Sequence, residues 1–291
     1  MFARHIVALP AVLALLAVIP ALTGCGAKDL SEAAIAQAAD ATVAEGGMRI
    51  ALKQTLTLPG GGRVETSGSG VIDTAGQASH LTLKVTRAPD VVVGAFDTRD
   101  LSTEVITDHA TVYTHSAQLN QLLGAGRKWV KIDAVEMGRA AGVDITALPR
   151  PGQDPAQAMR QLRAVSGKVE TVGREEVRGV ATTHHRTTID LRLYPALVPA
   201  ADRAAARAAI GRLVDEIGVS EIPVEVWIGE DDLVRRLSQK LPLEMAGGPI
   251  AIEQRFEFYD FGTAVRVEVP PPSEVTDVTD LAGSGAATIG P

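Results

Sequence analysis

Apolar and polar residues alternate with a period of two along most of this chain, which predicts β-strands. In the first such segment Ile50 and Leu52 face one way, whereas Arg49 and Lys53 face the other. Turn residues at 59–62 then predict a hairpin with the next segment. The longest expected strands span residues 48–58, 63–73, 169–178, 180–191, 222–228, 233–241, 250–259 and 263–269. Shorter strands are expected between residues 81 and 133.

Helical spacing of apolar residues interrupts this alternation at a few places. One helix is expected at Lys28 to Ala44, with Ser31 as its N-terminal cap. A clearer one is expected at Ala201 to Ile217, where an apolar stripe lies opposite charged residues. Further helical signals span residues 134–141 and 155–164.

Short connections between about ten strands favour an antiparallel sheet over parallel βαβ units. Its apolar face must be covered, and the few helices are the only elements that can cover it. We therefore expect an α+β fold, a strongly curved antiparallel sheet or half-barrel with helices across its concave face. No change of composition divides residues 25–269, which we interpret as one domain, and the Pro-rich and Gly-rich residues 270–291 predict a frayed C-terminal tail.

The N-terminus has the features of a secretory signal, with Arg4 ahead of an apolar run from Ile6 to Leu22. The sequence Leu22-Thr23-Gly24-Cys25 ends this run with the only cysteine of the chain. It resembles the lipobox of bacterial lipoproteins, which implies a signal peptide at residues 1–24 and a diacylglyceryl group on Cys25. The alternative is an uncleaved signal anchor, since the run approaches the length of a membrane span.

Composition limits the possible functions. The formal net charge of −7 disfavours nucleic acid as a partner. With Cys25 modified, no thiol remains for a disulfide or for thiolate ligation of a metal. A hydrophobic content of 46% excludes general disorder, so the fold must be stabilised by a packed core.

Several strand and turn segments resemble the LppX/LprG group of actinobacterial lipoproteins, which have a LolA-like fold. They are Arg127-Lys128-Trp129-Val130-Lys131-Ile132-Asp133, residues 223–237 from Pro-Val-Glu-Val-Trp to Arg-Arg-Leu, and Phe258-Tyr259-Asp260-Phe261-Gly262. The resemblance covers Lys28 to Val278. It implies a half-barrel whose cavity holds acyl chains of a lipid or lipoglycan, and carriage of that lipid within the cell envelope.

The inward-facing apolar residues are the candidate lining of such a cavity: Ile50, Leu52, Leu83, Val85, Val226, Ile228, Phe256 and Phe258. The apolar loop 194–199 and the helix that ends at Ile217 supply the candidate lid: Leu197, Val198, Ile210, Leu213, Val214 and Ile217. The pattern fits a filled core equally well, and only the resemblance favours a cavity. We expect a monomer without a cofactor, anchored at the extracytoplasmic face of the cell membrane, with a transporter or another envelope protein as a possible partner.

The alternative function is an envelope sensing or protein-interaction lipoprotein, because LolA-like domains also resemble periplasmic regulators that hold an anti-sigma factor. Trp129 and Trp227 lie in the polar register of their strands. We interpret them as outer-face packing, with an exposed partner surface as the alternative. An enzyme is disfavoured, since no grouping of nucleophile, base and orienting residue emerges. His184 and His185 are adjacent on a strand and should point to opposite faces, which argues against a shared metal ion.

Overall fold

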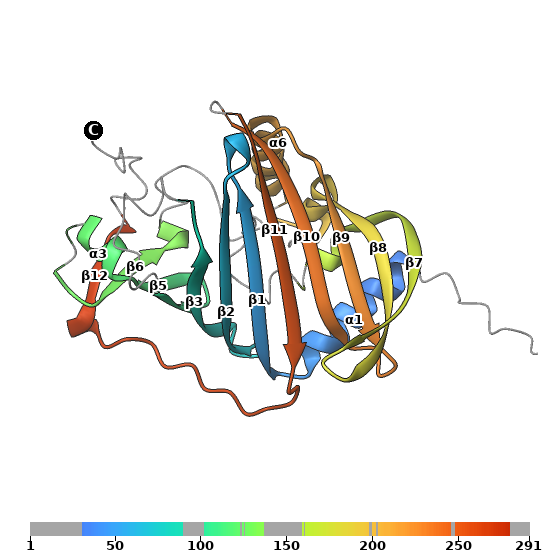
Figure 1. Cartoon of the computed structure of the whole chain (residues 1–291), viewed down its shortest axis with the longest axis horizontal. Coiled ribbons are helices and arrows are strands. Elements are labelled where there is room, and N and C mark those ends of the chain that lie inside the picture. The colour runs from blue at the N-terminus through green and yellow to red at the C-terminus, as the bar shows by residue number, and fades with distance from the viewer. Residues whose placement is uncertain are drawn as a thin grey trace, which may run out of the picture.

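The computed structural model of the chain describes residues 31–89, 102–122, 124, 126–136, 159, 161–197, 200–201, 203–245 and 248–279. Within these residues twelve strands form one open, curved sheet in the order β12-β6-β5-β4-β3-β2-β1-β11-β10-β9-β8-β7 (Figure 1). The strands are β1 Gly47–Thr57, β2 Arg63–Asp73, β3 Ala78–Arg87, β4 Ser102–Asp108, β5 Thr111–His115, β6 Trp129–Asp133, β7 Val165–Val177, β8 Val180–Asp190, β9 Glu221–Gly229, β10 Val234–Met245, β11 Gly248–Tyr259 and β12 Val275–Asp277. Every neighbouring pair is antiparallel except β6 and β12, so the expected curved antiparallel sheet is confirmed.

Among the described residues few helices accompany the sheet, as expected. They are the α-helices α1 Glu32–Ala44, α3 Ala117–Leu122 and α6 Arg203–Ile217, and the 3-10 turns η1 Pro59–Gly61, η4 Leu162–Ala164, η5 Leu191–Leu197 and η6 Pro272–Glu274. Ser31 caps α1 as predicted, because its hydroxyl accepts a hydrogen bond from the amide of Ala34. Of the helix expected at 134–141 only the first three residues are described, and they are helical. Half of the one expected at 155–164 lies outside the described residues, and the described half is helical.

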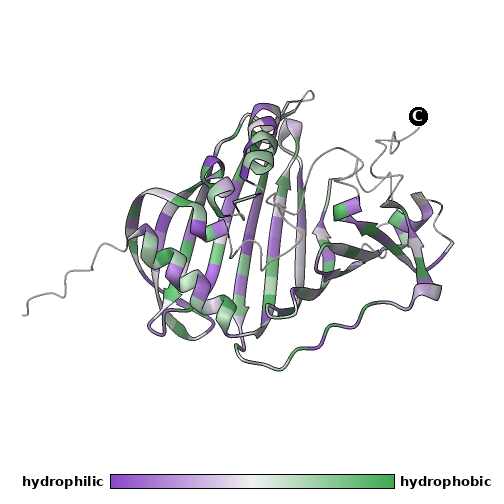
Figure 2. Cartoon of the chain, turned by 180° about the vertical axis from the view of Figure 1, so that it is seen from behind, coloured by the Kyte–Doolittle hydropathy of each residue, from purple (hydrophilic) through white to green (hydrophobic). Residues whose placement is uncertain are grey.

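Figure 1 views the convex face of the sheet, and Figure 2 views the opposite, concave face with α1 and α6 in front of the strands. The main core lies between these layers. Ile35, Ala38 and Ala39 of α1 are almost completely buried and belong to one cluster with apolar residues of β1, β9, β10 and β11. Helix α1 is also tied to the sheet, because the Thr42 hydroxyl accepts a hydrogen bond of 2.9 Å from the amide of Val234 at the start of β10.

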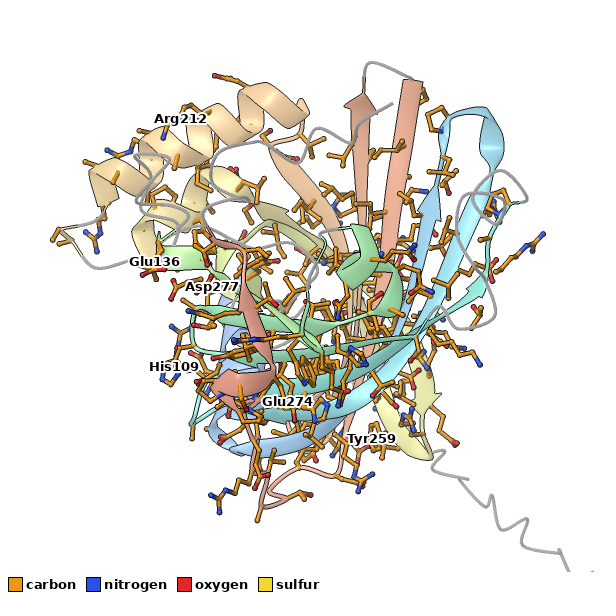
Figure 3. All side chains as sticks on the ribbon, turned by 90° about the vertical axis from the view of Figure 1, so that its left-hand side faces the viewer. His109, Glu136, Arg212, Tyr259, Glu274 and Asp277 are labelled. Atoms are coloured by element: carbon orange, nitrogen blue, oxygen red, sulfur yellow. The ribbon has the colours of Figure 1, made fainter. Side chains whose placement is uncertain are left out.

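The sheet bends most visibly near β2 and β3, where Figure 3 shows the strands curling around the interior. Gly68 and Gly70 of β2 lie on the concave face, opposite Leu52 and Ile50 of β1. Neither position has room for a side chain, since a Cβ on Gly70 would overlap the carbonyl oxygen of His80 on β3. These glycines therefore permit the close approach of β2 and β3.

The C-terminal segment differs from both expectations made for it. Residues 263–269 do not form a strand, because β11 is already paired with β1 on one side and β10 on the other. The chain instead crosses to the far edge of the sheet (Figure 1). There, within the predicted frayed tail, Val275–Asp277 form β12 against β6. Arg127 fixes this end by donating hydrogen bonds to the carbonyl oxygens of Pro272 and Val275.

Candidate lipid-binding surface

The structure brings most of the predicted lining residues together on the concave face. Backbone register places Ile50 opposite Phe258, and Leu52 opposite Phe256. In the same way Phe256 is opposite Leu237, and Leu237 is opposite Val226. Six of the predicted residues are buried in the main cluster: Ile50, Leu52, Val226, Ile228, Phe256 and Phe258. Leu83 packs against the cluster half-buried, and Val85 is half-buried on the same face of β3.

The concave face changes character along the strands. Leu52, Phe256 and Leu237 lie side by side on β1, β11 and β10. Two residues away on each of these strands, an inward-facing glutamine takes the place of an apolar residue. These are Gln54, Gln254 and Gln239, which we call the glutamine ladder. The Gln239 amide donates to Gln254 Oε1 at 2.7 Å, and the Gln254 amide donates to Gln54 Oε1 at 2.8 Å. Gln254, in the middle, is 5% exposed.

Beyond the ladder the concave face is apolar again but no longer fully covered. Its residues are all half-buried, and we call them the distal apolar surface: Leu56, Val64, Leu241, Leu243, Ile250 and Ile252. This surface lies toward the β1–β2 and β10–β11 hairpins, at the top of Figure 1, where α6 lies behind the sheet. The ladder thus lies between the buried core and a less covered apolar surface, of which Leu241 still packs against the core.

The predicted lid residues have different environments. Ile210 of α6 is buried in the main cluster, and Val214 packs against it half-buried. Leu197, at the end of η5, is 39% exposed. Val198 and the side chains of Leu213 and Ile217 lie outside the described residues, as does Cys25.

Sequence reasoning missed the ladder although a signal was present. The inward series Ile50, Leu52, Leu56 omits one position, and so does the series Ile252, Phe256, Phe258; glutamine occupies both gaps. A polar residue in an otherwise apolar register marks a change of environment along a strand. The third glutamine, on β10, could be aligned with them only through the strand order.

The convex face carries a compact polar cluster around Trp227. Its ring stacks on His184 with centroids 4.0 Å apart, and its Nε1 donates to Glu175 at 2.9 Å. That hydrogen bond is the main reason why the pKa of Glu175 lies below its usual value. The two nitrogens of His184 each lie 3.0 Å from a carboxylate oxygen, one of Glu175 and one of Glu225.

Trp227 is 3% exposed and Trp129 is 5% exposed, so outer-face packing is confirmed for both. The alternative of an exposed tryptophan surface is wrong. Side chains of neighbouring strands cover Trp227, including Arg236, whose guanidinium lies 5.1 Å from the ring centroid. Polar register alone could not distinguish a covered ring from an exposed one.

His185 points to the concave face, opposite to His184, as the strand geometry predicted. It is 2% exposed, and its Nδ1 lies 3.3 Å from the Thr171 hydroxyl. Burial lowers the pKa of His185 because it disfavours the charged ring, and His184 lowers it further.

Stability should therefore depend on pH through His185. The unfolded chain takes up a proton below pH ~6.5, whereas the folded ring resists it, so this contribution is complete above pH ~6.5 and is lost as the pH falls toward the folded pKa. Between pH 7.5 and 5.5 we expect His185→Gln to lose less free energy of unfolding than the original chain, by on the order of 1 kcal/mol. Urea denaturation at both pH values measures this, and equal losses would contradict it.

Other kinds of site find little support in the part of the chain described. No group of three or more histidine, cysteine or acidic residues there is arranged to hold a metal ion. No helix among the same residues is long and apolar enough to cross a membrane. An open pocket of about 580 Å³ lies at the β1–β2 hairpin tip, lined by Gly61, Gly62, Arg63, Arg87, Ala88 and Pro89. None of the predicted lining residues contributes to it.

Comparisons with known proteins found a curated relative and similar solved structures. No family model matches the chain. An uncharacterized 31.2 kDa protein of the rplA-rplJ intergenic region of Streptomyces griseus is 31% identical over 168 residues, 57% of this chain and 53% of that protein. The chain thus spans about half the length of the curated relative it matches.

Two similar solved structures come from mycobacteria. The lipoprotein LppX of Mycobacterium tuberculosis has 12% identity and a TM-score of 0.45, over 82% of this chain and 100% of LppX. LprF of Mycobacterium bovis has 16% identity and a TM-score of 0.38, over 82% of this chain and 96% of LprF. At these values the similarities do not bear on function, which must be argued from the residues of the concave face.

Proposed function

We propose that this protein is a lipoprotein that binds acyl chains of a lipid or lipoglycan on the distal apolar surface and carries the lipid within the cell envelope. The observation that carries this proposal is the change along the concave face from fully buried to half-buried apolar residues, beyond the glutamine ladder. In this proposal a lipid anchor on Cys25 holds the protein at the extracytoplasmic face of the membrane, and the protein performs no covalent chemistry.

Moving a 16-carbon chain from a bilayer into water costs on the order of 10 kcal/mol, at ~0.8 kcal/mol per CH2. A carrier removes most of this cost by offering apolar side chains in place of the bilayer. The distal apolar surface supplies aliphatic side chains from three adjacent strands, β1, β10 and β11, and from β2. The Trp129 and Trp227 rings, on which the interaction alternative partly relied, are covered.

Native mass spectrometry of protein purified from a bacterial host tests the proposal. We expect a bound lipid mass on the original chain and at least a tenfold loss of binding in Ile252→Glu, because a carboxylate would then occupy the apolar surface. Ala251→Glu is the matched control, since the neighbouring residue on β11 points to the convex face. Recovery of lipid-free protein alone from several preparations would contradict the proposal.

A further inference from the structure

The glutamine ladder has two chemically different ends. Three amides joined by two hydrogen bonds leave one acceptor and one donor without a partner in the chain of amides. Here the donor end is Gln54, and the acceptor end is Gln239, because the Gln239 amide group already donates to Gln254. Each bond polarises the next, so the terminal oxygen is a better acceptor than that of an isolated amide.

The acceptor end is unsatisfied. Gln239 Oε1 is shielded from solvent and has no hydrogen-bond partner. The residue opposite it on β9 is Val224, which has no side-chain donor, whereas the register places Thr66 beside Gln54 at the other end. A buried acceptor without a partner is destabilising, since it has lost water and gained nothing in return. A donor on a bound ligand would satisfy this acceptor.

The position of Gln239 indicates which ligand would reach this acceptor. Gln239 lies on β10 between Leu237, which is buried in the core, and Leu241, which is half-buried against the core and belongs to the distal apolar surface. A lipid whose chains rest on the distal apolar surface would meet the ladder where that surface ends. The terminal amide torsion of a glutamine is soft, so a small rotation lets Oε1 meet an incoming donor.

We propose that Gln239 Oε1 accepts a hydrogen bond from the ligand, so that the protein selects acyl lipids with a hydroxyl or amide N–H donor near the junction of head and tails. This inference rests on the proposed function and deepens it, from acyl chains in general to donor-bearing lipids. Specificity is strong when a binding site contains a buried polar group, because a ligand that lacks the matching donor leaves this group without a hydrogen bond.

Lipid transfer from vesicles to the purified full-length protein tests the inference. The probes are 1,2-dipalmitoylglycerol, which has one free hydroxyl, and 1,2-dipalmitoyl-3-acetylglycerol, in which that hydroxyl is esterified. We expect the free hydroxyl to be preferred by about five- to tenfold, the effect of one neutral hydrogen bond. Gln239→Met should abolish the preference because it keeps the side-chain size and removes the acceptor.

Gln54→Met is the matched control. It also breaks one ladder bond and also leaves Gln254 with an unpaired group, yet it retains the free oxygen of Gln239. It should therefore keep most of the preference. Equal transfer of both lipids to the original chain, or equal loss of preference in both variants, would overturn the inference while leaving lipid carriage intact. Failure to take up either lipid would instead overturn the proposed function, and the inference with it.

Discussion

Gly70→Ala is expected to lower the free energy of unfolding by about 3 kcal/mol, the upper end of the range for overpacking. The added Cβ would overlap the carbonyl oxygen of His80 and lie 2.9 Å from Leu81 Cα. Both atoms belong to the backbone of β3, so no rotation of a side chain relieves the overlap. Strands β2 and β3 would have to separate where the sheet bends. Chemical denaturation followed by circular dichroism measures the loss.

Gly173→Ala is the control for this prediction. Gly173 also lies within a strand, β7, but nothing stands within 4 Å of its added Cβ and its φ is not positive. Alanine there should be neutral or stabilise by up to about 1 kcal/mol, because it restricts the unfolded chain. If Gly70→Ala were as well tolerated as this control, the two glycines of β2 would not be what allows β3 to approach.

The alternating pattern predicted the sheet because strand periodicity is local. Ile50 and Leu52 share a face whatever lies beside them, so their burial on the concave side could be foreseen. Strand order is not local. Nothing in the apolar alternation of Val265, Val267 and Val269 tells that β11 is central and offers no free edge to a following strand. That segment has the composition of a strand but crosses instead to the far edge.

The candidate site was predictable only in outline, for a related reason. Periodicity assigns a residue to a face but says nothing about how far along the strand the covering helices reach. Phe256 and Ile252 therefore look equivalent in the sequence, whereas the first is buried under the core and the second is half-buried beyond the ladder. Of the residues placed on the cavity wall, most proved to belong to the buried core cluster that includes α1, and the half-buried residues of the distal apolar surface were not named as lining.

Because Phe256 lies in the buried part of β11, we expect Phe256→Ala to lower the free energy of unfolding by about 3–5 kcal/mol. Phe256 is 2% exposed, and its ring is stacked on Phe258 with centroids 6.3 Å apart. Alanine there removes a large apolar side chain from a row that is closed on both flanks, by Leu52 and by Leu237. Because the surrounding strands are paired, the space left can collapse only in part.

Ile252→Ala is the matched control, on the same strand and the same face but beyond Gln254. Its half-buried side chain loses fewer contacts, so we expect a cost below about 2 kcal/mol together with weaker lipid uptake. Urea titrations of both variants give the two stabilities, and vesicle transfer gives the uptake. Equal costs for the two substitutions would mean that the concave face has a single environment throughout. A clear difference would place the closed core on one side of the ladder and the lipid-contacting surface on the other.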